Sequence, residues 1–94
     1  MNTPLYTEAG KEAVMQIYNK LMAMTEDIEV QANTSVHQWI SDDLDYIDVF
    51  YLGKEPDGDR QEEYYSEGGE MMTDAQAIDF LNVRYNNTLT AIGR

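Results

Sequence analysis

Apolar side chains recur every three or four positions in two long stretches of this chain, and that spacing constrains the fold more than any other feature. In the first stretch the residues with this spacing are Val14, Ile17, Tyr18 and Leu21. Such spacing places the side chains on one face of an α-helix, and that face must be buried against other elements. The pattern predicts a helix over about residues 7–25.

The second stretch opens with a helix-start signal. Thr73 and Gln76 form the Thr-x-x-Gln pattern of a capping box, in which each side chain bonds a backbone amide of the other residue. A stripe of large side chains follows at spacings of three or four, namely Ile78, Leu81, Tyr85, Leu89 and Ile92. We therefore predict a helix over about residues 74–92 whose stripe packs on the core of the domain. A homodimer through this helix is the alternative.

The middle of the chain favours a short helix followed by a β-hairpin. Ser35 and Gln38 match a second capping box and predict a helix at about 35–44. Residues 46–52 are rich in β-branched and aromatic side chains, and the turn sequence Pro-Asp-Gly follows them. This composition predicts a hairpin that pairs residues 46–53 with 60–66.

One long helix is the alternative for the same segment. Helical spacing continues up to Gly53, a suitable C-terminal glycine, through Val36, Ile40, Leu44, Ile47 and Tyr51. This alternative would give an all-α three-helix domain. The hairpin instead predicts an α+β fold in which the 94 residues form a single domain, 1–94, around one modest core.

Three patterns that the sequence lacks indicate the cellular compartment in which we expect the protein. It has no cysteine, so neither disulfides nor thiolate metal sites are available. Its first residues lack a basic region followed by an apolar run, and no window approaches the roughly 18 apolar residues of a membrane span. We expect a cytoplasmic protein with no membrane association.

The negative charge is concentrated in one part of the chain. Eighteen acidic residues against six basic ones give a net charge of −12. Between residues 42 and 79 there are thirteen acids and two bases, which is −11 of the total. Such a field repels nucleic acid and anionic membranes and attracts basic protein surfaces. We therefore expect a basic partner protein and no direct binding of nucleic acid.

Catalytic and metal-binding patterns are missing. His37 is the only histidine, and a general base or a metal site needs further groups around it. A calcium loop with Gly58 at its sixth position would have Gly53 and Tyr64 at its first and last positions, where ligands are required. The sequence predicts a protein that is not an enzyme, with no catalytic residue, metal or cofactor.

The acidic segment also contains tyrosines, and this combination is typical of a protein-binding surface. Aromatic side chains anchor interfaces, while carboxylates steer the approach to a basic surface. The candidate partner-binding residues are Asp42, Asp43, Asp45, Asp48, Tyr51, Glu55, Asp57, Asp59, Glu62, Glu63, Tyr64 and Tyr65.

These features favour an inhibitor that acts as a nucleic-acid mimic. Duplex DNA carries about one charge per 1.7 Å of axis, so thirteen carboxylates match roughly 22 Å of duplex. In size, acidity and aromatic content the chain resembles the DNA mimics among phage-encoded inhibitors of restriction and CRISPR nucleases. The resemblance implies that it occupies the basic channel of a nuclease or effector complex. The alternatives are an immunity protein or antitoxin that neutralises a basic toxin, and a small structural or accessory phage subunit.

Overall fold

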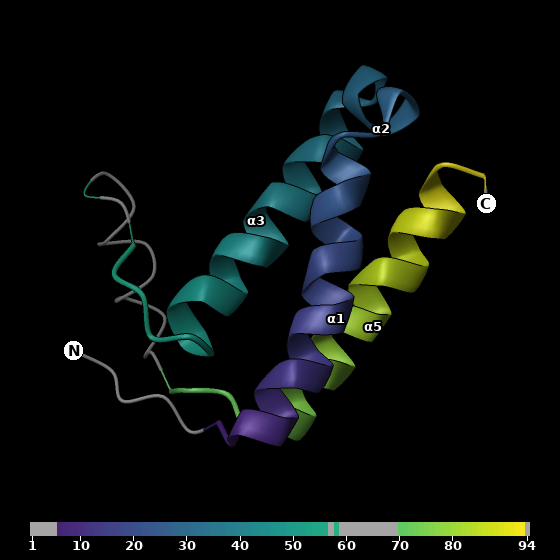
Figure 1. Cartoon of the computed structure of the whole chain (residues 1–94). Coiled ribbons are helices and arrows are strands. Elements are labelled where there is room, and N and C mark those ends of the chain that lie inside the picture. Colours follow the sequence, from purple (N-terminus) through teal and green to yellow (C-terminus); the bar gives the residue numbers. More distant parts are fainter. Residues whose placement is uncertain (1–5, 57, 59–69, 94) are drawn as a thin grey trace.

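The computed structural model describes residues 6–56, 58 and 70–93, and within them every regular element is a helix. The helices are α1 (Glu8–Thr25), α2 (Ile28–Ala32), α3 (Thr34–Phe50) and α5 (Asp74–Ala91). Figure 1 shows α1 and α5 running in the same direction, with α3 beside them in the opposite direction. The short helix α2 joins α1 to α3 at one end of this bundle.

The predicted hairpin is wrong, and with it the α+β fold class. Residues 46–50 are the last turn of α3, and the described residues contain no strand. The other half of the hairpin, residues 60–66, lies outside the described part of the chain. The all-α alternative fits instead, with three long helices and α2 as an addition.

Burial explains why the long helix forms despite its β-favouring composition. Ile47 and Tyr51 continue the apolar stripe of the preceding turns, and each is 0% exposed. As a strand, the same segment would turn alternate side chains to opposite faces and break this stripe. After α3, Gly53 has a φ of 75°, a left-handed conformation that glycine adopts without steric cost.

The two end helices confirm the sequence predictions closely. In α1 the Thr7 hydroxyl accepts a hydrogen bond from the Gly10 amide at 3.0 Å. In α5 both halves of the capping box between Thr73 and Gln76 are present. The middle helix begins one residue before the prediction, since Asn33 rather than Ser35 supplies its cap. The five-residue α2, capped by Asp27, was not predicted.

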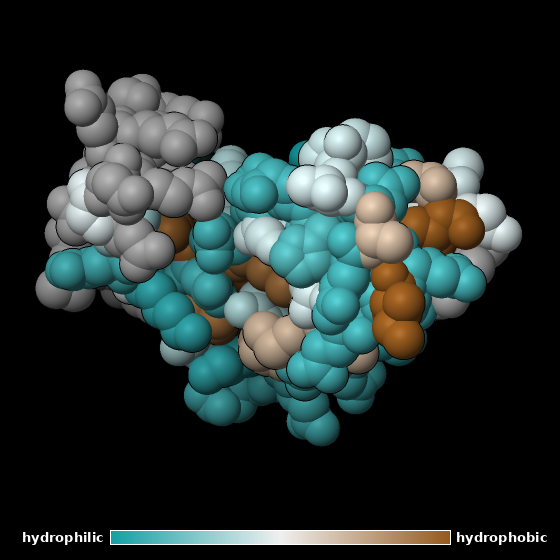
Figure 2. Space-filling model, turned by 90° about the horizontal axis from the view of Figure 1, so that it is seen from above, coloured by the Kyte–Doolittle hydropathy of each residue, from teal (hydrophilic) through white to brown (hydrophobic). Residues whose placement is uncertain are grey.

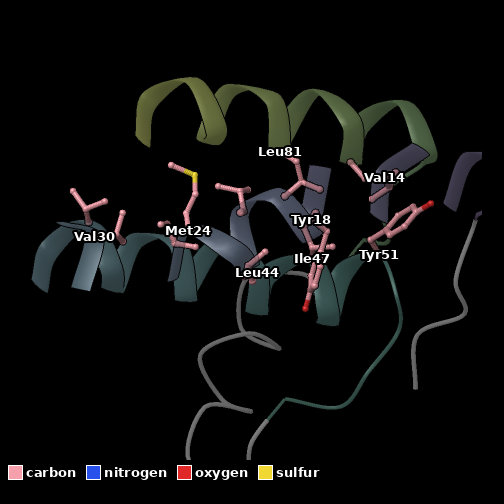
Figure 3. Close-up of a cluster of buried hydrophobic side chains, with 12 residues drawn as sticks. Val14, Tyr18, Met24, Val30, Leu44, Ile47, Tyr51 and Leu81 are labelled. Carbon is pink, nitrogen blue, oxygen red and sulfur yellow. The ribbon is translucent and has the colours of Figure 1, made fainter. Parts of the chain in front are cut away.

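A single main core lies between the three long helices. Figure 3 shows its side chains pointing inward from each of them. Val14 and Leu21 of α1, Ile47 of α3, and Ala77 and Leu81 of α5 are all 0% exposed. The remaining stripe residues of α5 pack against this core, so the stripe that offered a dimer interface is used inside the domain.

Asp74 joins the ends of all three long helices. Its carboxylate accepts hydrogen bonds from the Thr7 amide at 3.2 Å, the Thr7 hydroxyl at 3.0 Å and the Tyr51 hydroxyl at 2.6 Å. It also lies directly against Gly10 of α1. These contacts fix the start of α1 and the end of α3 at the N-terminus of α5, where a negative charge is also favoured by the helix dipole.

Candidate functional site

Four of the candidate binding residues lie on α3. Asp42, Asp43, Asp45 and Asp48 fall within two turns, about 9 Å of helix axis at 1.5 Å per residue. All four are half-buried. Because successive residues of a helix are rotated by about 100°, they divide between two sides of α3. Asp42 and Asp43 lie toward α5, and Asp45 and Asp48 lie toward α1.

Asp43 faces α5 and forms an ion pair there. Its carboxylate lies 3.5 Å from Nε of Arg84, and the Arg84 guanidinium carbon lies 4.1 Å from the centre of the Phe80 ring. Burial raises the pKa of Asp43, and the neighbouring Arg84 opposes that shift. Asp43 therefore contributes to the contact between α3 and α5 as well as to the charge of the surface.

Asp48 faces α1 and ties it to α3. The Tyr18 hydroxyl donates to its carboxylate at 2.8 Å, and Nζ of Lys54 lies 3.8 Å from the same oxygen. Burial raises the pKa of the Tyr18 hydroxyl, and the hydrogen bond to Asp48 raises it further. Tyr18 consequently stays a neutral hydrogen-bond donor. Much of the negative charge of Asp48 is offset by these contacts with Tyr18 and Lys54.

Asp42 lines a pocket between α3 and α5. The pocket holds about 340 Å³ and is lined by Trp39, Asp42, Asp43, Arg84, Asn87 and Thr88. The Gln38 side chain donates to the Asp42 carboxylate at 3.0 Å. The Trp39 side chain stands at the surface with 55% of its area exposed. A large exposed aromatic ring beside carboxylates is the chemistry of an interface anchor.

Asp45 lines a second pocket, on the opposite side of α3. This one holds about 290 Å³ between α1 and α3, and its lining includes Tyr18, Met22, His37 and Asp48. His37, the single histidine, thus lies at the surface groove and not in a ligand cluster. Among the described residues no three His, Asp or Glu side chains are grouped so that they could hold a metal ion.

One face of the molecule is mostly hydrophilic. Figure 2, which views the molecule from above, shows polar residues over most of that face, with hydrophobic residues at one end and in smaller areas between the polar ones. Among the described residues, the large apolar side chains with substantial exposure are Met22, Ile28, Trp39 and Val83. Of these, Trp39 and Met22 each border one of the α3 pockets.

The other candidate residues lie apart from the four aspartates of α3 or outside the described residues. Tyr51 is 0% exposed, its hydroxyl bonds Asp74, and its ring lies 5.5 Å from that of Tyr6. Burial raises the pKa of this hydroxyl, and its hydrogen bond to Asp74 raises the pKa further. Tyr51 is thus a core residue, while Glu55 is exposed. Asp57, Asp59, Glu62, Glu63, Tyr64 and Tyr65 lie outside the described residues.

Arg84 and Asn87 complete the α3–α5 pocket and were not predicted from the sequence. Both lie on α5, on the turns next to the buried stripe. Tyr46 helps to hold α5 in place, because its ring stacks on Phe80 with 5.1 Å between centres. The sequence shows only that Arg84 is a basic residue beside the apolar stripe of α5. It does not show that Arg84 pairs with Asp43.

Comparisons with known proteins found no relative. No protein-family model, curated protein or solved structure matches the chain. In the described part of the chain no helix has the length and apolar character needed to cross a membrane. What the protein binds is therefore inferred from its own residues.

Proposed function

We propose that this chain is a protein-binding inhibitor that takes the place of nucleic acid on the basic surface of a partner. The observation that carries the proposal is the group of four aspartates within two turns of α3, two on its α5 side and two on its α1 side. Four carboxylates lie within about 9 Å of helix axis, a length over which duplex DNA carries about five charges. Arg84 and Lys54 lie against two of these carboxylates and leave a net charge of −2 there. The four aspartates belong to the segment that holds −11 of the net charge of −12.

The mechanism is competition for the same basic groups. Lys and Arg side chains that line a nucleic-acid channel would meet the α3 carboxylates, with Trp39 standing at the surface beside them. The excess negative charge accelerates the encounter and makes it sensitive to salt. Nucleases and nucleic-acid-guided effector complexes carry such channels and are the class of partner that we propose. The cytoplasm is the compartment that fits this role and a chain without cysteine.

A displacement experiment tests the proposal. Immobilised protein captures its partner from a lysate at low salt, and high salt elutes it. The partner is then bound to its own nucleic acid in a gel shift and titrated with this chain. We expect the shifted band to disappear without a supershift, since both ligands need the same cations. A stable ternary complex would exclude the mimic mechanism.

A matched pair of variants distinguishes the effect of the α3 aspartates from the effect of net charge. Asp42→Lys with Asp45→Lys changes the net charge from −12 to −8, two units per substitution. Glu12→Lys with Glu26→Lys, at exposed positions of α1 and its C-cap, makes the same change elsewhere. We expect displacement to weaken roughly tenfold or more in the first variant and about two- to threefold in the second. Equal losses would assign the effect to net charge alone.

A toxin-neutralising protein is a second candidate, favoured by the exposed Trp39. A single aromatic anchor with a few carboxylates around it suits a small footprint over one active site better than a long channel. In that case the partner's activity on a small substrate would be blocked, and its bound nucleic acid would stay in place. The gel shift described above therefore separates the two functions.

A further inference from the structure

The pocket between α3 and α5 has the residues needed to hold one cationic side chain. Trp39 and Asp42 are three residues apart on α3, so their side chains lie on the same face of the helix. The indole is 55% exposed, and both residues line the pocket. An exposed indole attracts a cation over its face, and a carboxylate at its side binds the same cation by hydrogen bonds.

The chain already contains this arrangement once, formed by its own residues. Arg84 lies with its guanidinium carbon 4.1 Å from the centre of the Phe80 ring and its Nε 3.5 Å from the Asp43 carboxylate. The guanidinium is thus stacked on an aromatic ring and paired with an aspartate at the same time. Trp39 and Asp42 offer the same two groups, a ring and a carboxylate, to a guanidinium from another molecule.

Asp42 can accept further hydrogen bonds besides the one from Gln38, because a carboxylate has about four acceptor positions. Two aspartates and one arginine line the pocket, which is a net charge of −1. Arg84 is paired with Asp43, so its repulsion of an incoming cation is reduced on that side. A volume of about 340 Å³ is at the low end of ligand pockets, which suits a single long side chain rather than a large ligand.

We propose that this pocket binds an arginine side chain of the partner protein, with the guanidinium on the Trp39 indole and its N–H groups donating to Asp42. Arginine is favoured over lysine because its planar group can stack on a ring and bond a carboxylate in the same pose. This inference rests on the proposed function in one respect, namely that the partner presents a basic surface. It adds the place on this chain where the partner is anchored, the α3–α5 pocket, and the type of residue that binds there, an arginine.

Trp39 makes the proposal directly measurable, since it is the only tryptophan of the chain. The probes are three blocked tripeptides, Gly-X-Gly with acetyl and amide ends, in which X is arginine, lysine or citrulline. Citrulline keeps the shape of arginine and lacks its charge. Binding is followed by tryptophan emission and by the indole N–H resonance. We expect the arginine peptide to bind about tenfold more tightly than the citrulline peptide, with the lysine peptide between them.

Two neutralised aspartates distinguish the pocket from the general negative field. Asp42→Asn removes the carboxylate that lines the pocket, whereas Asp45→Asn removes one that lines the groove on the other side of α3. We expect about a fivefold or greater loss of arginine-peptide affinity in the first and less than a twofold loss in the second. Equal affinity of native protein for the arginine and citrulline peptides, or equal losses in the two variants, overturns the proposal.

The displacement assay separates this inference from the proposed function. Trp39→Ala should weaken nucleic-acid displacement about tenfold, whereas Ile28→Ala, at another exposed apolar position, should change it less than twofold. If Trp39→Ala displaces as well as the native chain, the pocket is not the anchor, although the mimic mechanism stands. The mimic mechanism fails on a different result, a ternary complex of partner, nucleic acid and this chain.

Discussion

Replacing Gly10 with alanine should destabilise the domain, which is the opposite of the usual effect in a helix. Within a helix alanine is favoured over glycine by about 0.5–1 kcal/mol, because glycine loses more backbone freedom on folding. At Gly10, however, an added Cβ would overlap the carboxylate of Asp74 on α5. The sign of the change therefore depends on what it costs to move that carboxylate.

The cost exceeds the helical gain because Asp74 is held in place. Turning its carboxylate away would break hydrogen bonds from the Thr7 amide, the Thr7 hydroxyl and the Tyr51 hydroxyl. Keeping the carboxylate in place would push α1 away from α5, and inserting atoms into a packed contact costs about 1–3 kcal/mol. After subtraction of the helical gain, we expect Gly10→Ala to lower the free energy of unfolding by about 1–2 kcal/mol.

Urea denaturation followed by circular dichroism measures this difference, and a second background tests its cause. In an Asp74→Ala background the overlapping atoms are gone, so Gly10→Ala should regain its helical benefit of about 0.5–1 kcal/mol. The effect of the same substitution thus changes sign between the two backgrounds. Stabilisation by Gly10→Ala in the native background would refute the close contact between α1 and α5 on which this reasoning depends.

The remaining predictions concern the core and its pH dependence. Leu81→Ala should cost roughly 2–5 kcal/mol because Leu81 is 0% exposed between the helices, whereas Val83→Ala, at a half-exposed position of α5, should cost less than about 0.5 kcal/mol in the same denaturation experiment. A loss under about 1 kcal/mol for Leu81→Ala would contradict its place in the core. The Tyr51 hydroxyl, followed by the Thr7 groups, lowers the pKa of Asp74. A lowered carboxyl pKa adds stability above the usual value near 3.9, and this stability is lost as the pH falls through the lowered pKa. Tyr51→Phe should therefore be less stable than the native chain at pH 6, and the difference should shrink below pH 4; a constant difference across this range would contradict the contribution of Asp74.

Much of the helical framework was predictable because it depends on local signals. The capping box at Thr73 and the spacing of apolar residues fix α5 and most of α1 without reference to the rest of the chain. Residues 46–50 were predicted wrongly because their composition favours a strand, while their spacing favours a helix. The partners that decide between the two, such as Phe80 stacked on Tyr46, lie on a different helix.

The candidate site was predictable in its charge but not in its geometry. The four aspartates of α3 stand out in the sequence, whereas nothing local shows that Asp43 meets Arg84 or that Asp48 meets Tyr18. Tyr51 was grouped with the binding residues from its composition, and only its contact with Asp74 reveals a core role. These pairings arise from the packing of helices that are distant in sequence, so local patterns carry no information about them.

The contact between Thr7 and Asp74, 67 residues apart in sequence, also has a consequence for the order of folding. α1, α2 and α3 are neighbours along the chain and can associate early, whereas closing the contact with α5 requires a much longer loop and is entropically slower. Until α5 arrives, the part of the core that Ala77 and Leu81 fill remains open to water. During synthesis each nascent chain would pass through this stage, in which α5 has not yet packed, and aggregation would be most favoured there. The first 73 residues, with sixteen acids and four bases, already carry a net charge of −12, and this charge would keep such nascent chains apart.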